Sequence, residues 1–218
     1  MVNKLVYFFV GTSAEFIKIA PIIFELKKRK IPFKIITSGQ NRINFEDLEG
    51  YTGKIKIDIS FPEKVNKSSP SHFAFWAIRT LIAGIVNLRR ELRGCTKENT
   101  FFFIHGDTVT SSIGALIGKF YGLTIVHIES GDLSYNLLEP FPEEICRNIN
   151  IRLADILFPP NEWARNNLKF LNKEKVSTKE DTILESYYWA AKHKPITKNF
   201  NKMLKDLGKY YILILHRQ

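Results

Sequence analysis

Polar motifs with acid–base potential follow short apolar, β-rich runs of this sequence. They occupy residues 11–18 (Gly-Thr-Ser-Ala-Glu-Phe-Ile-Lys), 105–108 (His-Gly-Asp-Thr), 127–131 (His-Ile-Glu-Ser-Gly) and, at the start of a predicted helix, 142–144 (Pro-Glu-Glu). Parallel strands place ligands beyond their carboxyl ends, so we expect Asp107, Glu129 and Glu143 to meet in one cleft. Carboxylates gathered in a cleft can act as general acids and bases, and the motifs therefore predict an enzyme.

The elements that would position these motifs alternate between strand and helix. Apolar runs predict strands at residues 5–10, 33–37, 55–60, 101–104, 123–128, 156–158 and 210–215. Helical spacing of apolar residues predicts helices at 15–29, 41–50, 71–93, 109–120, 142–154, 161–171, 184–192 and 202–207. A strand–helix–strand opening requires a parallel sheet, so the predicted fold class is α/β with a Rossmann-like sheet.

The chain divides into two predicted domains. Residues 1–172 form the Rossmann-like domain, and residues 173–218 form the beginning of an incomplete second one. Residues 210–215 have the composition of a buried strand, yet His216 and two further residues end the sequence directly after it. We expect the residues beyond about 173 to be poorly packed, exchanged between chains or completed by a partner domain.

Each motif also has a purely structural interpretation. Gly11 could serve only a tight turn, and Lys18 could be a solvated lysine. Asp107 could cap a helix, and Glu143 could interact only with a helix dipole. The glycine spacing of residues 11–18 fits neither a dinucleotide fingerprint nor a P-loop, so no cofactor is predicted. The histidines do not complete a recognisable ligand spacing, so no metal is predicted.

Composition limits the ligands, the partners and the cellular location that fit this sequence. The net charge of +10 fits a solvated lysine-rich surface first, a cleft for a phosphate-bearing substrate second and a nucleic-acid surface last. Two cysteines make no disulfide framework, which indicates a reducing, cytoplasmic location. The longest apolar stretch, residues 73–88, is interrupted by Arg79, and no signal peptide is evident. The partners predicted therefore exclude nucleic acid and membrane.

Taken together and in order, the motifs resemble those of the UDP-N-acetylglucosamine 2-epimerases. That family carries G-T-R-P-E-x-I-K-x-x-P, H-G-D-T, H-V-E-A-G, P-E-E-x-N-R and, in a second domain, H-R-R-E. The corresponding segments here are residues 11–21, 105–108, 127–131, 142–147 and 216–218. The resemblance runs along the whole chain but covers about the N-terminal half of the family's usual length.

The resemblance implies a GT-B fold of two Rossmann-like domains and a role for each matching residue. The implied catalytic residues are Asp107, Glu129, Glu143 and His216. The implied substrate-binding residues are Gly11, Thr12, Lys18, His105 and Arg147. The family's chemistry removes the C2 proton of UDP-N-acetylglucosamine and eliminates UDP, which then re-adds to give the manno isomer; a hydrolysing variant captures water instead. Such a product would serve cell-envelope polysaccharide biosynthesis.

Departures from the family pattern leave other functions open. Ser13 and Ala14 replace its first Arg-Pro, Leu133 replaces a second arginine, and Cys146 replaces an asparagine. Two lost arginines weaken the binding of a diphosphate. The prediction is therefore an epimerase in truncated or impaired form, acting as a homo-oligomer or lacking its C-terminal half. The alternatives are a non-catalytic interaction module, one half of a split enzyme, or another GT-B nucleotide-sugar enzyme.

Overall fold

In the described part of the chain, seven parallel strands form one sheet. The computed structural model describes residues 4–43, 46–61, 69–193, 198–207 and 209. The strands lie in the order β3-β2-β1-β4-β5-β6-β7 and comprise β1 (Leu5–Val10), β2 (Phe33–Thr37), β3 (Ile59–Ser60), β4 (Thr100–His105), β5 (Thr124–Ile128), β6 (Ile156–Phe158) and β7 (Glu174–Lys175). The predicted α/β, Rossmann-like fold class is confirmed.

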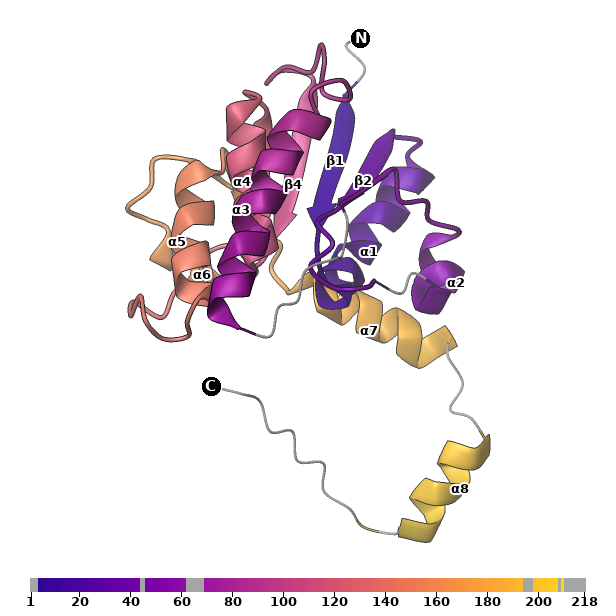
Figure 1. Cartoon of the computed structure of the whole chain (residues 1–218). Coiled ribbons are helices and arrows are strands. Elements are labelled where there is room, and N and C mark those ends of the chain that lie inside the picture. Colours follow the sequence, from indigo (N-terminus) through magenta and orange to yellow (C-terminus); the bar gives the residue numbers. More distant parts are fainter. Residues whose placement is uncertain (1–3, 44–45, 62–68, 194–197, 208, 210–218) are drawn as a thin grey trace.

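Helices cover the two faces of this sheet (Figure 1). They are α1 (Ser13–Lys28), α2 (Glu49–Thr52), α3 (Pro70–Asn87), α4 (Val109–Phe120), α5 (Glu143–Leu153), α6 (Glu162–Asn167), α7 (Thr182–His193) and α8 (Lys198–Leu207), with a 3-10 turn, η1 (Glu46–Leu48), before α2. Among the described helices, none is both long and apolar enough to cross a membrane.

Strand β1 shows why its residues are apolar without interruption. Tyr7 and Phe9 belong to the core cluster under α3, α4 and α5, whereas Val6, Phe8 and Val10 belong to the cluster under α1. A strand covered on both faces needs apolar side chains at every position. This central strand therefore anchors both halves of the core.

The chain reverses its direction across the sheet between β1 and β4, which are hydrogen-bonded neighbours. Such a reversal opens a crevice beyond the carboxyl ends of the strands, where ligands bind. Gly11 directly follows β1 at this reversal, and a Cβ on it would come within 2.1 Å of Thr110 Oγ1 and 2.6 Å of Ser38 Oγ. A close approach of neighbouring side chains, rather than a turn with positive φ, therefore requires this glycine.

Some element boundaries differ from the prediction. Helix α3 ends at Asn87 instead of residue 93, although Leu88 and Leu92 remain buried in the turns that follow. The helical spacing of apolar residues thus continues past the C-terminal end of α3. The predicted strand at 55–60 is reduced to two residues, and β7 was not predicted because its residues, Glu174 and Lys175, are both charged.

Helix α7 packs against α1 at a defect in that helix. Pro21 lies inside α1 and has no N–H, so the carbonyl of Ile17 lacks its helical donor. The hydroxyl of the buried Ser186 in α7 donates to this carbonyl at 2.6 Å. Trp189 of α7 also stacks on Tyr51, with ring centroids 4.9 Å apart.

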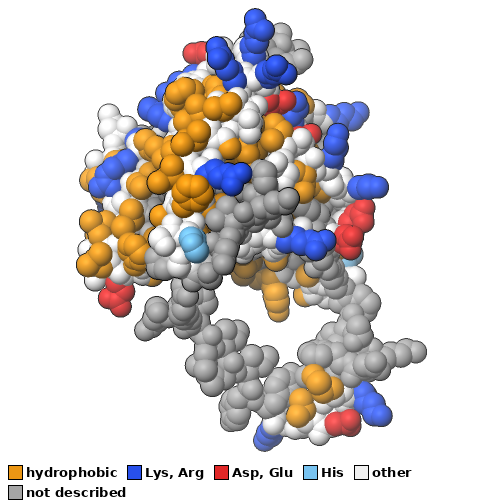
Figure 2. Space-filling model, viewed as in Figure 1, with side chains coloured by type: hydrophobic (Ala, Val, Ile, Leu, Met, Phe, Trp, Pro, Cys, Tyr) orange, Lys and Arg blue, Asp and Glu red, His pale blue; other side chains and the backbone are white. Residues whose placement is uncertain are grey.

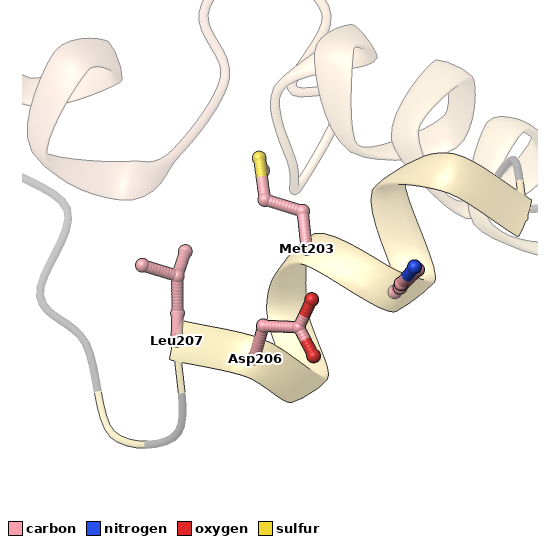
Figure 3. A pocket seen from close by; sticks show the side chains of 4 residues that line it. Met203, Asp206 and Leu207 are labelled. Carbon is pink, nitrogen blue, oxygen red and sulfur yellow. The ribbon is translucent and has the colours of Figure 1, made fainter.

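These contacts attach residues 182–193 to the helix layer of the sheet. Helix α8 stands apart from the sheet in Figure 1, and the hollow drawn in Figure 3 is lined by α8 side chains alone, namely Lys202, Met203, Asp206 and Leu207. The predicted strand at 210–215 and His216 lie outside the described residues. The division into domains at residue 172 therefore stays a prediction.

Candidate active site

Glu15 ties the first loop of the crevice to the second. Its buried carboxylate accepts hydrogen bonds from the backbone N–H groups of Gly11 (2.6 Å) and Thr12 (2.9 Å), and from the hydroxyl of Thr108 (2.5 Å). Burial raises the pKa of Glu15, although these hydrogen bonds oppose the shift. The backbone N–H groups of Gly11 and Thr12 are thus bonded to a carboxylate of the chain itself.

Glu15 has no predicted role at the site, yet its spacing from Thr12 carries a signal. Thr12 accepts a hydrogen bond from the backbone N–H of Glu15, and the Glu15 side chain returns to the backbone of Thr12. This is a capping box, which the spacing Thr-x-x-Glu before an apolar helix indicates. In this chain the capping acid also reaches across to Thr108, on the loop that carries Asp107.

Glu129 stands at the end of β5 and is held by Lys18 of α1. The Lys18 ammonium lies 2.7 and 2.6 Å from the two carboxylate oxygens. His105 Nε2 lies 3.2 Å from Glu129 Oε2. Glu129 has φ of 59°, a left-handed conformation that is uncommon for a residue with a side chain. Such strain persists only where the surrounding structure holds the residue in place, and it is found most often at functional sites.

Burial raises the pKa of Glu129 to about 6. The positive charge of Lys18 opposes this shift, whereas the negative charges of Asp181 and Asp107 add to it. A carboxyl group with this pKa can both accept and release a proton near neutral pH. Asp107 and Glu129 follow neighbouring strands, β4 and β5, and interact electrostatically across the crevice.

Two buried histidines stand beside this pair in their neutral form. Burial and the charge of Lys18 hold the pKa of His105 well below its ordinary value. Burial lowers the pKa of His127 to about 4, although a hydrogen bond from its Nε2 to the carbonyl of Gly106 (2.8 Å) opposes the shift. In the part of the chain that the structure describes, no group of three His, Cys, Asp or Glu side chains could hold a metal ion.

Arg147 of α5 binds Asp107 through two nitrogens, Nη2 at 2.6 Å and Nε at 2.9 Å. Its third nitrogen, Nη1, lies 3.3 Å from Glu144 Oε2. Helical spacing favours a pair between Glu143 and Arg147, yet Glu144 is the residue that contacts Arg147. Glu144 takes that position because it is buried beneath the preceding loop, where it also accepts a hydrogen bond from the backbone N–H of Ser134.

Glu143 presents a carboxylate oxygen that is buried and has no hydrogen-bond partner among the described residues. Its charge and that of Asp107 both raise the pKa of the Cys146 thiol, in addition to the larger effect of burial. The two carboxylates therefore act on the same side chain of α5. A catalytic role for Glu143 stays a prediction.

Two acids that the sequence analysis passed over complete the charge distribution. Asp181 Oδ2 lies 4.0 Å from the Lys18 ammonium. Burial raises the pKa of Asp132, and the charges of Asp181 and Asp107 add to this effect while Arg147 opposes it. Both acids lie in loops without a strand or helix pattern, so no periodic signal could have marked them. Among the described residues, these carboxylates outnumber the two cations that form ion pairs with them, Lys18 and Arg147.

The lost arginines have different surroundings. Leu133, at one family arginine position, is buried and belongs to the hydrophobic core. Ser13 is the first residue of α1, next to its N-cap Thr12. His216, predicted as a catalytic residue, lies outside the described part of the chain.

Comparison with known proteins is consistent with this geometry. A family model described as UDP-N-acetylglucosamine 2-epimerase matches residues 25–218. A UDP-N-acetylglucosamine 2-epimerase of Campylobacter jejuni is 28% identical over 215 residues, which are 97% of this chain and 53% of the relative. The corresponding protein of Neisseria meningitidis is 26% identical, over 95% of this chain and 56% of the relative.

Solved structures share the fold. The Neisseria meningitidis UDP-GlcNAc 2-epimerase bound to UDP-GlcNAc superposes with a TM-score of 0.71 at 24% identity, over 94% of this chain and 53% of that one. The Methanocaldococcus jannaschii UDP-GlcNAc 2-epimerase in complex with UDP-GlcNAc and UDP gives 0.73 at 22% identity, over 93% and 53%. The chain spans about half the length of the curated relatives that it matches.

Proposed function

Because the chain belongs to the UDP-N-acetylglucosamine 2-epimerase family, we propose that its carboxylate crevice interconverts UDP-N-acetylglucosamine and UDP-N-acetylmannosamine. The observation that supports this most is Glu129, a partly buried carboxylate in a left-handed backbone conformation, with a pKa of about 6. It lies at the end of the strand next to the one that carries Asp107. Removing a proton from carbon requires a base of raised pKa, and this residue supplies one.

In the proposed reaction, a carboxylate of the crevice takes the proton from C2 of the sugar. The bond from C1 to the diphosphate oxygen breaks with its electron pair, so UDP leaves and a 2-acetamidoglucal forms. Return of the proton to the opposite face of C2 and of the UDP oxygen to C1 gives the manno isomer. In the hydrolysing alternative, water adds instead, and UDP and free N-acetylmannosamine are released.

The proposed roles follow the contacts. Glu129, Asp107 and Glu143 exchange protons, and His216 completes the catalytic set. Lys18, now paired with Glu129, turns to the anionic part of the substrate, and His105 stays neutral behind Glu129. Arg147 holds Asp107 in place. Gly11 and Thr12, held by Glu15, shape the edge where the substrate enters.

We also propose that the protein acts as a homo-oligomer that associates through α3 and α4. Phe75, Ile78, Ile82 and Val86 form a stripe on α3 at helical spacing and are 57–63% exposed; Leu116 and Phe120 continue it on α4. Figure 2 shows hydrophobic side chains gathered over this face. Six half-exposed large side chains offer on the order of 500 Å², an apolar centre for an interface of about 800 Å² per partner.

The proposed location is the cytoplasm, where the product would supply cell-envelope polysaccharide. Cys95 and Cys146 are both free thiols, as in proteins of reducing compartments.

An exchange experiment tests the proposed function. The protein, produced from its full natural reading frame, is incubated with UDP-N-acetylglucosamine in D₂O. We expect deuterium at C2, together with the manno isomer or free UDP. The variant Glu129→Gln should lose this exchange, whereas Glu162→Gln, on the exposed surface of α6, should keep it. Binding without exchange would favour the interaction module, and exchange that survives in Glu129→Gln would contradict the proposed role.

A further inference from the structure

A second recess opens at the end of the sheet that lies opposite the carboxylate crevice. Its volume is about 920 Å³, within the range of about 300–1,000 Å³ that is typical of small-molecule sites. It lies at the amino ends of β4, β5, β6 and β7. Its lining includes Lys97, Lys119, Arg152 and Lys173, together with Asp155 and Glu174. We call it the basic recess.

Two of its four cations have structural partners. The Lys173 ammonium donates hydrogen bonds to the carbonyls of Ile151 (2.9 Å), Arg152 (2.5 Å) and Ala154 (2.6 Å), where α5 ends. Lys97 forms an ion pair with Asp155 at 2.7 Å. Lys173 thus uses all three of its N–H donors, whereas Lys97 has its charge paired with Asp155.

The other two cations have donors left for a ligand. Arg152 uses one nitrogen, Nη1, for the carbonyl and side-chain oxygens of Asn148. Lys119, in the last turn of α4, has no carboxylate partner in the described ranges. Both side chains are exposed at the mouth of the recess.

Repulsion among these cations is only partly compensated. Burial lowers the pKa of Lys173, and the charges of Lys119, Arg152 and Lys97 lower it further, while Asp155 alone opposes them. Four cations against two acids leave the lining with excess positive charge. An anion bound between Lys119 and Arg152 would relieve this repulsion.

Part of the lining of the recess is apolar. Phe101 at the start of β4, Leu153 at the end of α5 and Ile156 of β6 contribute half-buried side chains to it. Cations beside apolar side chains in one recess suit a molecule that has one phosphate and a compact organic part.

We propose that the basic recess binds a small phosphomonoester, whose phosphate contacts Lys119 and Arg152 and whose organic part packs on Phe101, Leu153 and Ile156. The site is separate from the carboxylate crevice, because the two lie at opposite ends of the same parallel strands. The inference does not depend on the reaction at the crevice.

Calorimetric titration tests this site, with glucose 6-phosphate as the probe and glucose and inorganic phosphate as its two halves. We expect the phosphomonoester to bind more tightly than phosphate, and glucose not to bind. The double variant Lys119→Gln, Arg152→Gln should weaken binding at least tenfold. Lys192→Gln, an exposed lysine of α7, is the matched control and should bind like the parent protein.

Other outcomes would overturn the proposal. These are equal affinity in the double variant, equal binding of glucose, or binding of neither phosphate nor glucose 6-phosphate. A single-stranded oligonucleotide that binds in place of the phosphomonoester would identify a nucleic-acid surface instead. If the double variant loses its cooperative thermal transition, Lys119→Gln alone carries the test, because this side chain is exposed and its loss leaves no buried partner. Deuterium exchange at C2 should be unchanged in either variant.

Discussion

At Glu129, burial and charge act in opposite directions on one carboxyl group. Burial favours its protonated form, whereas the contact with Lys18 favours the carboxylate, and the result is a pKa of about 6. The sequence could mark this residue as an acid beyond a strand. It could not show the left-handed backbone or the lysine that approaches from α1, because both depend on how distant segments pack.

The pKa of Glu129 predicts how activity depends on pH. A base must be deprotonated to take the C2 proton, so kcat/KM should rise with pH and level off above about 6. Below that value it should fall about tenfold per pH unit, as the protonated fraction grows. The measurement is C2 exchange across the pH range. A profile that is flat around pH 6 would remove Glu129 from the role of base.

The buried carboxylate of Glu15 predicts a large effect on stability. Glu15→Ala would leave the N–H groups of Gly11 and Thr12 and the hydroxyl of Thr108 without their acceptor. We expect a loss of roughly 2–4 kcal/mol in the free energy of unfolding, since the fully buried N–H of Gly11 left unpaired costs about 1–3 kcal/mol and the two part-buried donors add less. Urea unfolding measures it. Glu25→Ala, an exposed acid later in the same helix, should change stability little.

At the scale of elements, a strand can be predicted from the sequence when it consists of a run of apolar residues. Strands β1, β2, β4, β5 and β6 are apolar runs, and the sequence analysis found each of them. The edge strand β7 consists of a glutamate and a lysine, and only its pairing with β6 makes it a strand. The choice between Glu143 and Glu144 as partner of Arg147 likewise depends on the loop before α5, which no helical spacing describes.

The contact between α1 and α7 predicts a specific coupling. Ser186→Ala removes the donor to the Ile17 carbonyl and should cost about 1 kcal/mol. In a Pro21→Ala background, residue 21 regains an N–H that can donate to the same carbonyl, so the second substitution should cost clearly less. A double-mutant cycle in urea measures the difference. Equal costs in both backgrounds would show that Pro21 does not create the need for Ser186.

At the scale of the whole molecule, the apolar stripe of α3 and α4 predicts an oligomer that charge can dissociate. Ile78→Glu with Ile82→Glu should shift the mass measured by light scattering towards that of the monomer, with the circular dichroism spectrum unchanged. Both side chains are more than half exposed, so the substitutions should not disturb the core. Tyr187→Glu on α7 is the control, and it should leave the mass unchanged. A parent protein that is already monomeric would contradict the proposed association.

The two ends of the strands carry opposite charge, and this gives the sheet an electric dipole along its strands. Acids gather beyond the carboxyl ends, and Lys97, Lys119, Arg152 and Lys173 gather at the amino ends. A strand of about five residues spans roughly 17 Å, which exceeds the Debye length of about 8 Å at physiological salt. At physiological salt, an ion that approaches one end of the strands therefore experiences mainly the electric field of that end. Added salt should weaken phosphomonoester binding at the basic recess more than nucleotide-sugar binding at the crevice, even though both ligands are anions.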